Sequence, residues 1–161
     1  MKPPKYDGTI HPEEWIKQIQ LFCQIKQITT EQEILKICKL SINSNINISK
    51  DSINTIAKLV KTLKENPFHI MFKNTAKRNL QYMKYVTERD GGNTVKFIRD
   101  FCSLCYDAEI TNEINEVKKY LKKALSNNEL LQEKFANKMK NVESMDELVK
   151  KFDEIIYGVC I

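Results

Sequence analysis

Two cysteines spaced like metal ligands, Cys102 and Cys105, are the first residues that could do chemistry. A structural zinc ion needs four converging ligands from cysteine, histidine or carboxylate side chains. The chain has no second cysteine pair with this spacing, and its two histidines, His11 and His69, lie in another part of the sequence. On a helix the spacing places both thiols on one face, beside Phe101. We therefore predict core packing for this pair, and no bound metal ion.

The two histidines also limit the catalytic chemistry that the chain could support. A catalytic nucleophile needs a nearby base and a group that orients that base, and no such set can be proposed around His11 or His69. The order Asp7-Gly8-Thr9 is not the Asp-Thr-Gly or Asp-Ser-Gly signature of an aspartic protease. We expect no catalytic residue, no cofactor, no small-molecule substrate and no enzymatic activity.

A basic ridge is formed by four lysines at helical spacing: Lys118, Lys119, Lys122 and Lys123. One interpretation is a solvated helix face, because Glu113, Glu116 and Glu133 lie nearby and we expect no aromatic side chain among the lysines for base stacking. The other is a surface that meets RNA or an acidic patch on a neighbouring subunit. The net charge of +5 over 161 residues is modest, so any RNA contact is expected to be weak and sensitive to salt.

The composition favours helices as the elements that position these residues. Hydrophobic residues make up 42% of the chain, enough for a core, while glycine and proline number only four each. No apolar leader and no run of 18 apolar residues occurs, so we expect no signal peptide, no membrane contact and a cytoplasmic location. The odd number of cysteines, five, is typical of reduced, buried thiols in an intracellular protein.

The stretch from Pro3 to Cys23 predicts an extended segment that leads into a helix. Tyr6 precedes the turn pair Asp7-Gly8, and Pro12 suits the first helical position because its missing N–H would be unpaired there. Acidic residues follow, against the positive end of the helix dipole. An apolar stripe at helical spacing comes next: Trp15, Ile16, Ile19, Phe22 and Cys23.

Periodicity and capping signals predict an all-α chain of two small lobes, residues 1–66 with about three helices and residues 67–161 with about five. We place the boundary at Asn66-Pro67, because a residue before proline is pushed out of the helical region. The expected third helix begins at Ser49 or Asp51, after a loop over 41–49 held by isoleucines. The fourth covers 68–86 and the fifth 94–108, the latter forming the centre of the second lobe.

Two stretches, in this order, resemble the capsid domain of the Gag polyprotein of Gypsy-type LTR retrotransposons. Tyr6-Asp7-Gly8 followed by His11-Pro12-Glu13-Glu14-Trp15 is similar to the family's aromatic–Asp–Gly lead into an acidic, tryptophan-bearing helix. Gly92-Asn93-Thr94 with the apolar residues to Cys105 resembles the core helix of the second lobe, related to the retroviral major homology region. The helix after Ser144 is similar to the one that closes such lobes. Domesticated capsid genes of the Arc type share this architecture.

The resemblance implies a retroviral or retrotransposon capsid-like fold and a structural protein that self-assembles into a shell, or virus-like particle, enclosing RNA. The chain would then be a homo-oligomer, with the first helix and its lead supplying contacts within rings. The first lobe's core and assembly residues would be Tyr6, Trp15, Ile19 and Phe22. The second lobe's core residues would be Val95, Phe97, Ile98, Phe101 and Leu104. The alternative function is that of a domesticated, monomeric helical adaptor that binds partner peptides.

Overall fold

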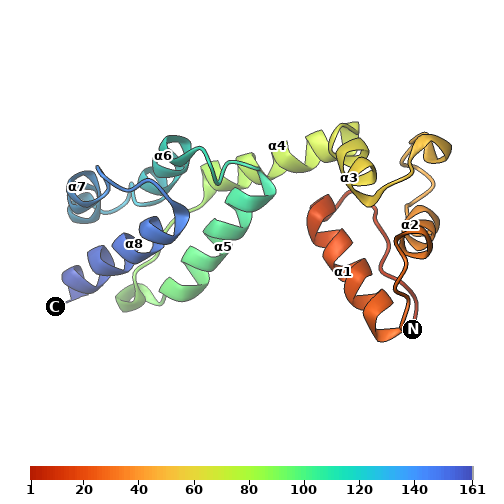
Figure 1. Cartoon of the computed structure of the whole chain (residues 1–161). Helices are drawn as coiled ribbons and strands as arrows, with labels where there is room; N and C mark the ends of the chain where they lie inside the picture. The colour runs from red at the N-terminus through yellow and green to blue at the C-terminus, as the bar shows by residue number, and fades with distance from the viewer. Residues whose placement is uncertain (161) are drawn as a thin grey trace. The chain divides into compact units, whose positions relative to one another are not determined.

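The structure, a computed structural model, describes residues 1–160 and the side chains as far as Gly158. Within these residues the prediction of an all-α chain is confirmed (Figure 1). The α-helices are α1 Pro12–Ile25, α2 Glu31–Leu40, α3 Ile56–Lys64, α4 Pro67–Tyr82, α5 Thr94–Asp107, α6 Ile114–Ala124, α7 Glu129–Lys138 and α8 Met145–Cys160. Two short 3₁₀ turns, η1 Lys50–Ser52 and η2 Glu88–Asp90, complete the regular structure of residues 1–160.

The chain divides into two compact units, Met1–Lys73 and a second unit that begins at Asn74. The division therefore falls within α4, later in the chain than the predicted boundary between residues 66 and 67. Asn66-Pro67 instead starts a helix: Pro67 is the first residue of α4, and the Asn66 side chain accepts a hydrogen bond from the Phe68 amide at 3.0 Å. Proline is well suited to this first helical position, because its fixed φ already matches the helix.

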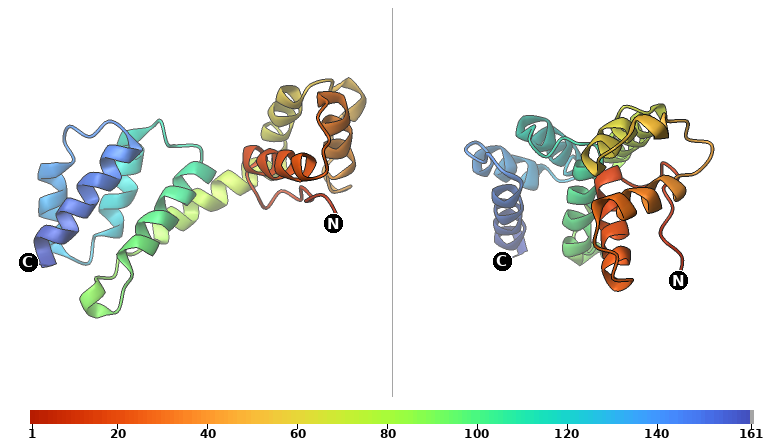
Figure 2. Two further views of the ribbon diagram at one scale, coloured as in Figure 1. Left: turned by 60° about the horizontal axis from the view of Figure 1, so that its bottom comes forward. Right: turned by 45° about the vertical axis from the view of Figure 1, so that its right-hand side comes forward.

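The first unit is built around α1, which packs against α2 and α3 (Figure 2). Its core consists of apolar side chains from these helices, from the lead segment and from the α2–α3 connection. The largest of the fully buried ones are Tyr6, Trp15, Ile19, Ile53, Leu59 and Leu63. The predicted first-lobe residues Trp15, Ile19 and Phe22 all lie in this core.

The third helix starts later than the sequence predicts. Residues 50–52 form only the 3₁₀ turn η1, and α3 begins at Ile56, where Thr55 accepts a hydrogen bond from the Lys58 amide at 3.1 Å. Asparagine and serine side chains compete for backbone hydrogen bonds, which explains the long non-helical connection. Its isoleucines Ile42, Ile46 and Ile53 are buried and hold it against the core.

The second unit has its own core, centred on α5. Phe97 and Phe101 of α5 are buried, and Phe97 packs against Tyr85 and Phe152 with ring centroids 5.1 Å and 5.7 Å apart. Helices α7 and α8 pack side by side in the same unit (Figure 2). The predicted core residues Ile98 and Leu104 are half-buried and contact this core.

The prediction that Val95 is a core residue of the second lobe is wrong, because its side chain is 69% exposed. It lies in the first turn of α5, outside the spacing that buries Phe97, Phe101 and Cys105 on one face. The predicted end of the fourth helix is also too late. α4 stops at Tyr82, and the Tyr85 amide donates instead to the Ala124 carbonyl of α6 at 2.9 Å.

Candidate assembly and binding surfaces

The lead segment is docked into the first unit by backbone pairing. The Tyr6 amide donates to the Ser41 carbonyl and the Asn43 amide donates to the Tyr6 carbonyl, each at 2.9 Å, which makes a parallel bridge between Tyr6 and Ile42. An isolated bridge of this kind satisfies the backbone groups that burial takes away from water. The lead is thus a structural part of the unit.

Trp15 holds the same segment from the side of α1. Its indole Nε1 donates to the Pro4 carbonyl at 2.9 Å, and its ring lies 5.3 Å from that of Tyr6, at a tilt of 47°. Both side chains are almost completely buried. A buried tryptophan usually needs a partner for its N–H, and the lead supplies it. The two residues predicted for the first lobe's core, Tyr6 and Trp15, therefore contact each other directly.

The turn between the lead and α1 depends on Gly8 and His11. Gly8 has φ +85°, a conformation that side-chain-bearing residues rarely adopt, and a Cβ there would lie 3.2 Å from Phe68 Cβ. His11 caps α1, because its Nδ1 accepts a hydrogen bond from the Glu13 amide at 3.1 Å. Its ring packs edge-on against His69, with centroids 5.2 Å apart. These contacts give His11 a structural role in starting α1.

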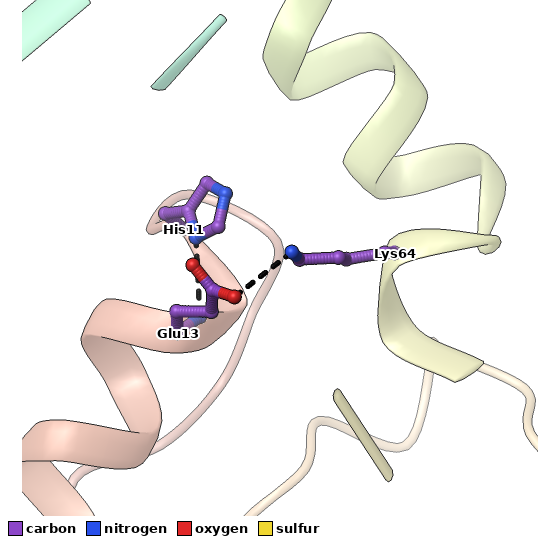
Figure 3. A network of polar contacts seen from close by, with 3 residues as sticks. All are labelled: His11, Glu13 and Lys64. Carbon is purple, nitrogen blue, oxygen red and sulfur yellow. Dashed lines mark hydrogen bonds and ion pairs between the residues drawn. The ribbon is translucent and has the colours of Figure 1, made fainter. Parts of the chain in front are cut away.

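An ion pair links the start of α1 to the end of α3 (Figure 3). Glu13 Oε1 lies 3.0 Å from Lys64 Nζ, and both side chains are partly exposed to solvent. Exposed pairs of this kind contribute about 1 kcal/mol or less to stability. Glu13 therefore has two local roles, because its amide donates to the His11 cap and its carboxylate holds Lys64.

The outer face of α1 carries two apolar side chains that the sequence interpretation missed. Leu21 is 59% exposed and Ile25 is 57% exposed, and they lie one helical turn apart. The predicted assembly residues Trp15, Ile19 and Phe22 are buried, so they cannot touch another molecule. Leu21 and Ile25 are four residues apart and lie beside the buried stripe. This second pair at helical spacing is the sequence signal that could have identified them.

The cysteine pair on α5 lies where the sequence prediction places it, on one helix beside Phe101. Cys105 is buried and Cys102 is half-buried. Burial raises the pKa of the Cys105 thiol to about 12, and burial also raises the pKa of Cys102. A raised pKa keeps these groups as neutral thiols, whereas metal ligation and nucleophilic attack need the thiolate.

The four lysines of the ridge lie on α6, but only two of them line the same depression. Lys119 and Lys123 line an open depression of about 470 Å³, together with Gln81 of α4 and with Glu116 and Tyr120 of α6. Lys122 is exposed and Lys118 half-buried, and neither lines this depression. Tyr120 was missed as a candidate, although it stands between the two lysine pairs in the sequence.

Among the described residues, no helix is both long and apolar enough to cross a membrane. Comparisons of the chain with protein-family models, with curated proteins and with solved structures gave no significant match. Function therefore has to be argued from the residues themselves.

Proposed function

We propose that this chain is a Gag-like structural protein that self-assembles into a closed shell around RNA. The observation that carries the proposal is the docked lead segment. The sequence resemblance requires an aromatic–Asp–Gly lead beside a tryptophan-bearing helix. Tyr6 pairs with Ile42, and Trp15 binds the Pro4 carbonyl. This arrangement supports the resemblance at the residues on which it rests.

A second feature that supports assembly is the exposed apolar pair on α1. Burying a leucine or isoleucine side chain contributes about 1.5–3 kcal/mol, so partly exposed residues such as Leu21 and Ile25 would each contribute roughly 1 kcal/mol at a contact. Such a contact is weak alone and gains strength when a closed symmetric ring repeats it. The occupant that we propose for this face is a second copy of the chain.

The test compares two double variants of α1 that add the same charge. Leu21→Glu with Ile25→Glu places carboxylates on the apolar pair. Gln20→Glu with Gln24→Glu places them on exposed polar positions of the same helix. Light scattering and negative-stain microscopy at raised salt and protein concentration would follow assembly. We expect particles from the unaltered chain and from the glutamine control, and none from the Leu21/Ile25 variant.

Two results would contradict the proposal. A chain that stays monomeric under every salt and protein concentration has no assembly function of its own, and a monomer with a peptide ligand would support the adaptor alternative. Equal loss of assembly in both double variants would show that Leu21 and Ile25 are not part of the contact, because the added charge alone would then explain the loss.

A further inference from the structure

The depression beside the lysine ridge combines groups that the ridge alone does not have. Gln81 enters from α4, and Lys119, Tyr120 and Lys123 from α6. Lys119 and Lys123 lie one turn apart on the same helix face, so their ammonium groups can reach the same ligand. Tyr120 is half-buried, packs against the core of the second unit and lines the depression.

Gln81 of α4 and Tyr120 of α6 line the depression together. The depression therefore brings an amide from one helix and a phenol from another to the same place. An amide offers both a donor and an acceptor, which is the pattern needed to read the edge of a nucleic-acid base. An aromatic ring beside it offers a stacking surface that accepts any base.

The charge around the depression is positive despite Glu116. The lining has two lysines, Lys119 and Lys123, and one carboxylate, Glu116. That carboxylate is also approached by Lys77, whose Nζ lies 3.9 Å from Glu116 Oε1. Among the side chains of residues 1–158, no ion pair within 4.0 Å involves Lys119 or Lys123, although the charge of Lys119 also acts on the Glu116 carboxylate. Lys123, with Lys119 beside it, can therefore face an anionic ligand.

We infer that this depression binds one nucleotide of a single-stranded RNA, with the base stacked on Tyr120 and its phosphates between Lys119 and Lys123. A purely acidic peptide would need the lysines but would leave the ring and the amide unused. A duplex would keep its bases paired, so they could not reach the ring. A positive surface with an aromatic platform is the combination found in sites for single strands.

This inference deepens the proposed function, since a shell that encloses RNA needs cationic contacts with it. Binding is measured on the full chain, at protein concentrations where light scattering detects no assembly. A failure of the RNA site therefore leaves the assembly test untouched, and a failure of assembly leaves the RNA measurement valid.

The probe is a fluorescent oligoadenylate of about ten nucleotides, within the site sizes of single-strand-binding folds. Anisotropy titrations over a range of salt give the affinity and its salt slope. Lys119→Gln with Lys123→Gln should flatten the slope by about 1.4, at ~0.7 for each phosphate contact on a single strand. Tyr120→Leu should weaken binding by roughly five- to hundred-fold and leave the slope unchanged.

Matched variants separate the site from general charge and from folding. Lys140→Gln with Lys150→Gln removes the same charge from exposed positions outside the depression and should leave the slope nearly unchanged. Tyr120→Phe keeps the ring and should bind within a few-fold of the unaltered chain. Circular dichroism confirms that each variant is folded before it is titrated.

Three results would overturn the inference. The first is unchanged RNA affinity in a folded Tyr120→Leu variant. The second is an equal flattening of the salt slope in the Lys140/Lys150 control. It would mean that RNA is attracted by the overall positive charge and not by this site. The third is displacement of the RNA by polyglutamate at equal charge, with the same dependence on Lys119 and Lys123, which would identify an acidic partner.

Discussion

The hydroxyl group of Tyr6 is buried and makes no hydrogen bond within the part of the chain that the structure describes. A buried polar group without a partner costs about 1–3 kcal/mol relative to its solvated state. Burial, followed by the negative charge of Asp7, raises the pKa of the Tyr6 hydroxyl to about 12. The ring is needed beside Trp15, whereas the hydroxyl weakens the unit.

Replacement of Tyr6 by Phe should therefore stabilise the chain by about 1 kcal/mol near neutral pH, because the ring stays and the unsatisfied group is removed. Urea unfolding followed by circular dichroism measures this. Tyr157→Phe, at an exposed position, is the control and should change little. A loss of stability in Tyr6→Phe would mean that the hydroxyl has a partner.

The same residue makes stability depend on pH in alkaline solution. An unfolded tyrosine ionises near pH 10, and the folded Tyr6 only near 12. A group with a raised pKa contributes its full stability below the unfolded value, and this is lost as pH rises through the folded value. The advantage of Tyr6→Phe over the unaltered chain should therefore grow between pH 10 and 12. A constant difference across that range would show that ionisation of Tyr6 does not cause the pH dependence.

The described cysteines should differ in reactivity according to burial. Cys102 is half-buried, whereas Cys23, Cys38 and Cys105 are buried, and burial raises the pKa of Cys38 and Cys105 to about 12. Iodoacetamide at about pH 8 should label Cys102 first and the other three only after denaturant is added. Mass spectrometry of the peptides identifies the labelled position, and equal labelling of Cys105 and Cys102 in the folded chain would refute this order.

At the scale of the elements, α1 and α5 end in the same way. After α1 the Ile28 amide donates to the Cys23 carbonyl at 2.8 Å, and after α5 the Ile110 amide donates to the Cys105 carbonyl at 3.1 Å. The residues in between, Gln27 and Glu109, have φ near +60°. This hydrogen-bond pattern is the Schellman motif, which usually places glycine at the left-handed position.

Gln27→Gly should stabilise the chain by about 0.5–1 kcal/mol, because a side chain at positive φ is strained and glycine is not. Gln24→Gly is the matched control, since it lies inside α1 and should destabilise by about 1 kcal/mol. The free energy of unfolding in urea distinguishes them. A loss of stability in both variants would show that the entropy of the unfolded chain outweighs the strain at Gln27.

The capping signals predict some helix starts and miss others. The spacings Thr30–Glu33, Ser144–Glu147 and Ser126–Glu129 all predict capping boxes. Thr30 and Ser144 do cap α2 and α8, by accepting from the amides of Glu33 and Glu147. Ser126 does not cap α7, because Asn128 accepts from the Leu131 amide instead. Short polar residues occur in clusters at these turns, and each can cap, so the choice depends on where the following apolar residues must be buried.

The apolar pattern predicts buried faces well and exposed contacts poorly. The stripe through Trp15 and Phe22 is buried, while Leu21 and Ile25 on the same helix are not. Periodicity marks the majority face of a helix but does not show which apolar residue is left uncovered by α2 and α3. The depression at Tyr120 could not be predicted for a related reason: it needs Gln81, which comes from a helix distant in the sequence.

At the scale of the whole molecule, the two proposed surfaces belong to different units. Leu21 and Ile25 lie in the unit that ends at Lys73, and the depression at Tyr120 lies in the unit that begins at Asn74. Each unit also has a separate hydrophobic core. Variants of one surface should therefore leave the other function measurable.

Trp15, the chain's one tryptophan, is completely buried in the first unit, so tryptophan fluorescence can distinguish the unfolding of the two units. Its fluorescence reports the unfolding of the first unit, whereas the far-ultraviolet signal reports helices of both units. Phe101→Ala removes a buried ring from the second core and should cost about 3–5 kcal/mol there. We expect it to shift the helical signal to lower urea and to leave the fluorescence transition in place, while Ile19→Ala should shift the fluorescence. Coincident transitions in both variants would mean that the two cores unfold as one cooperative system.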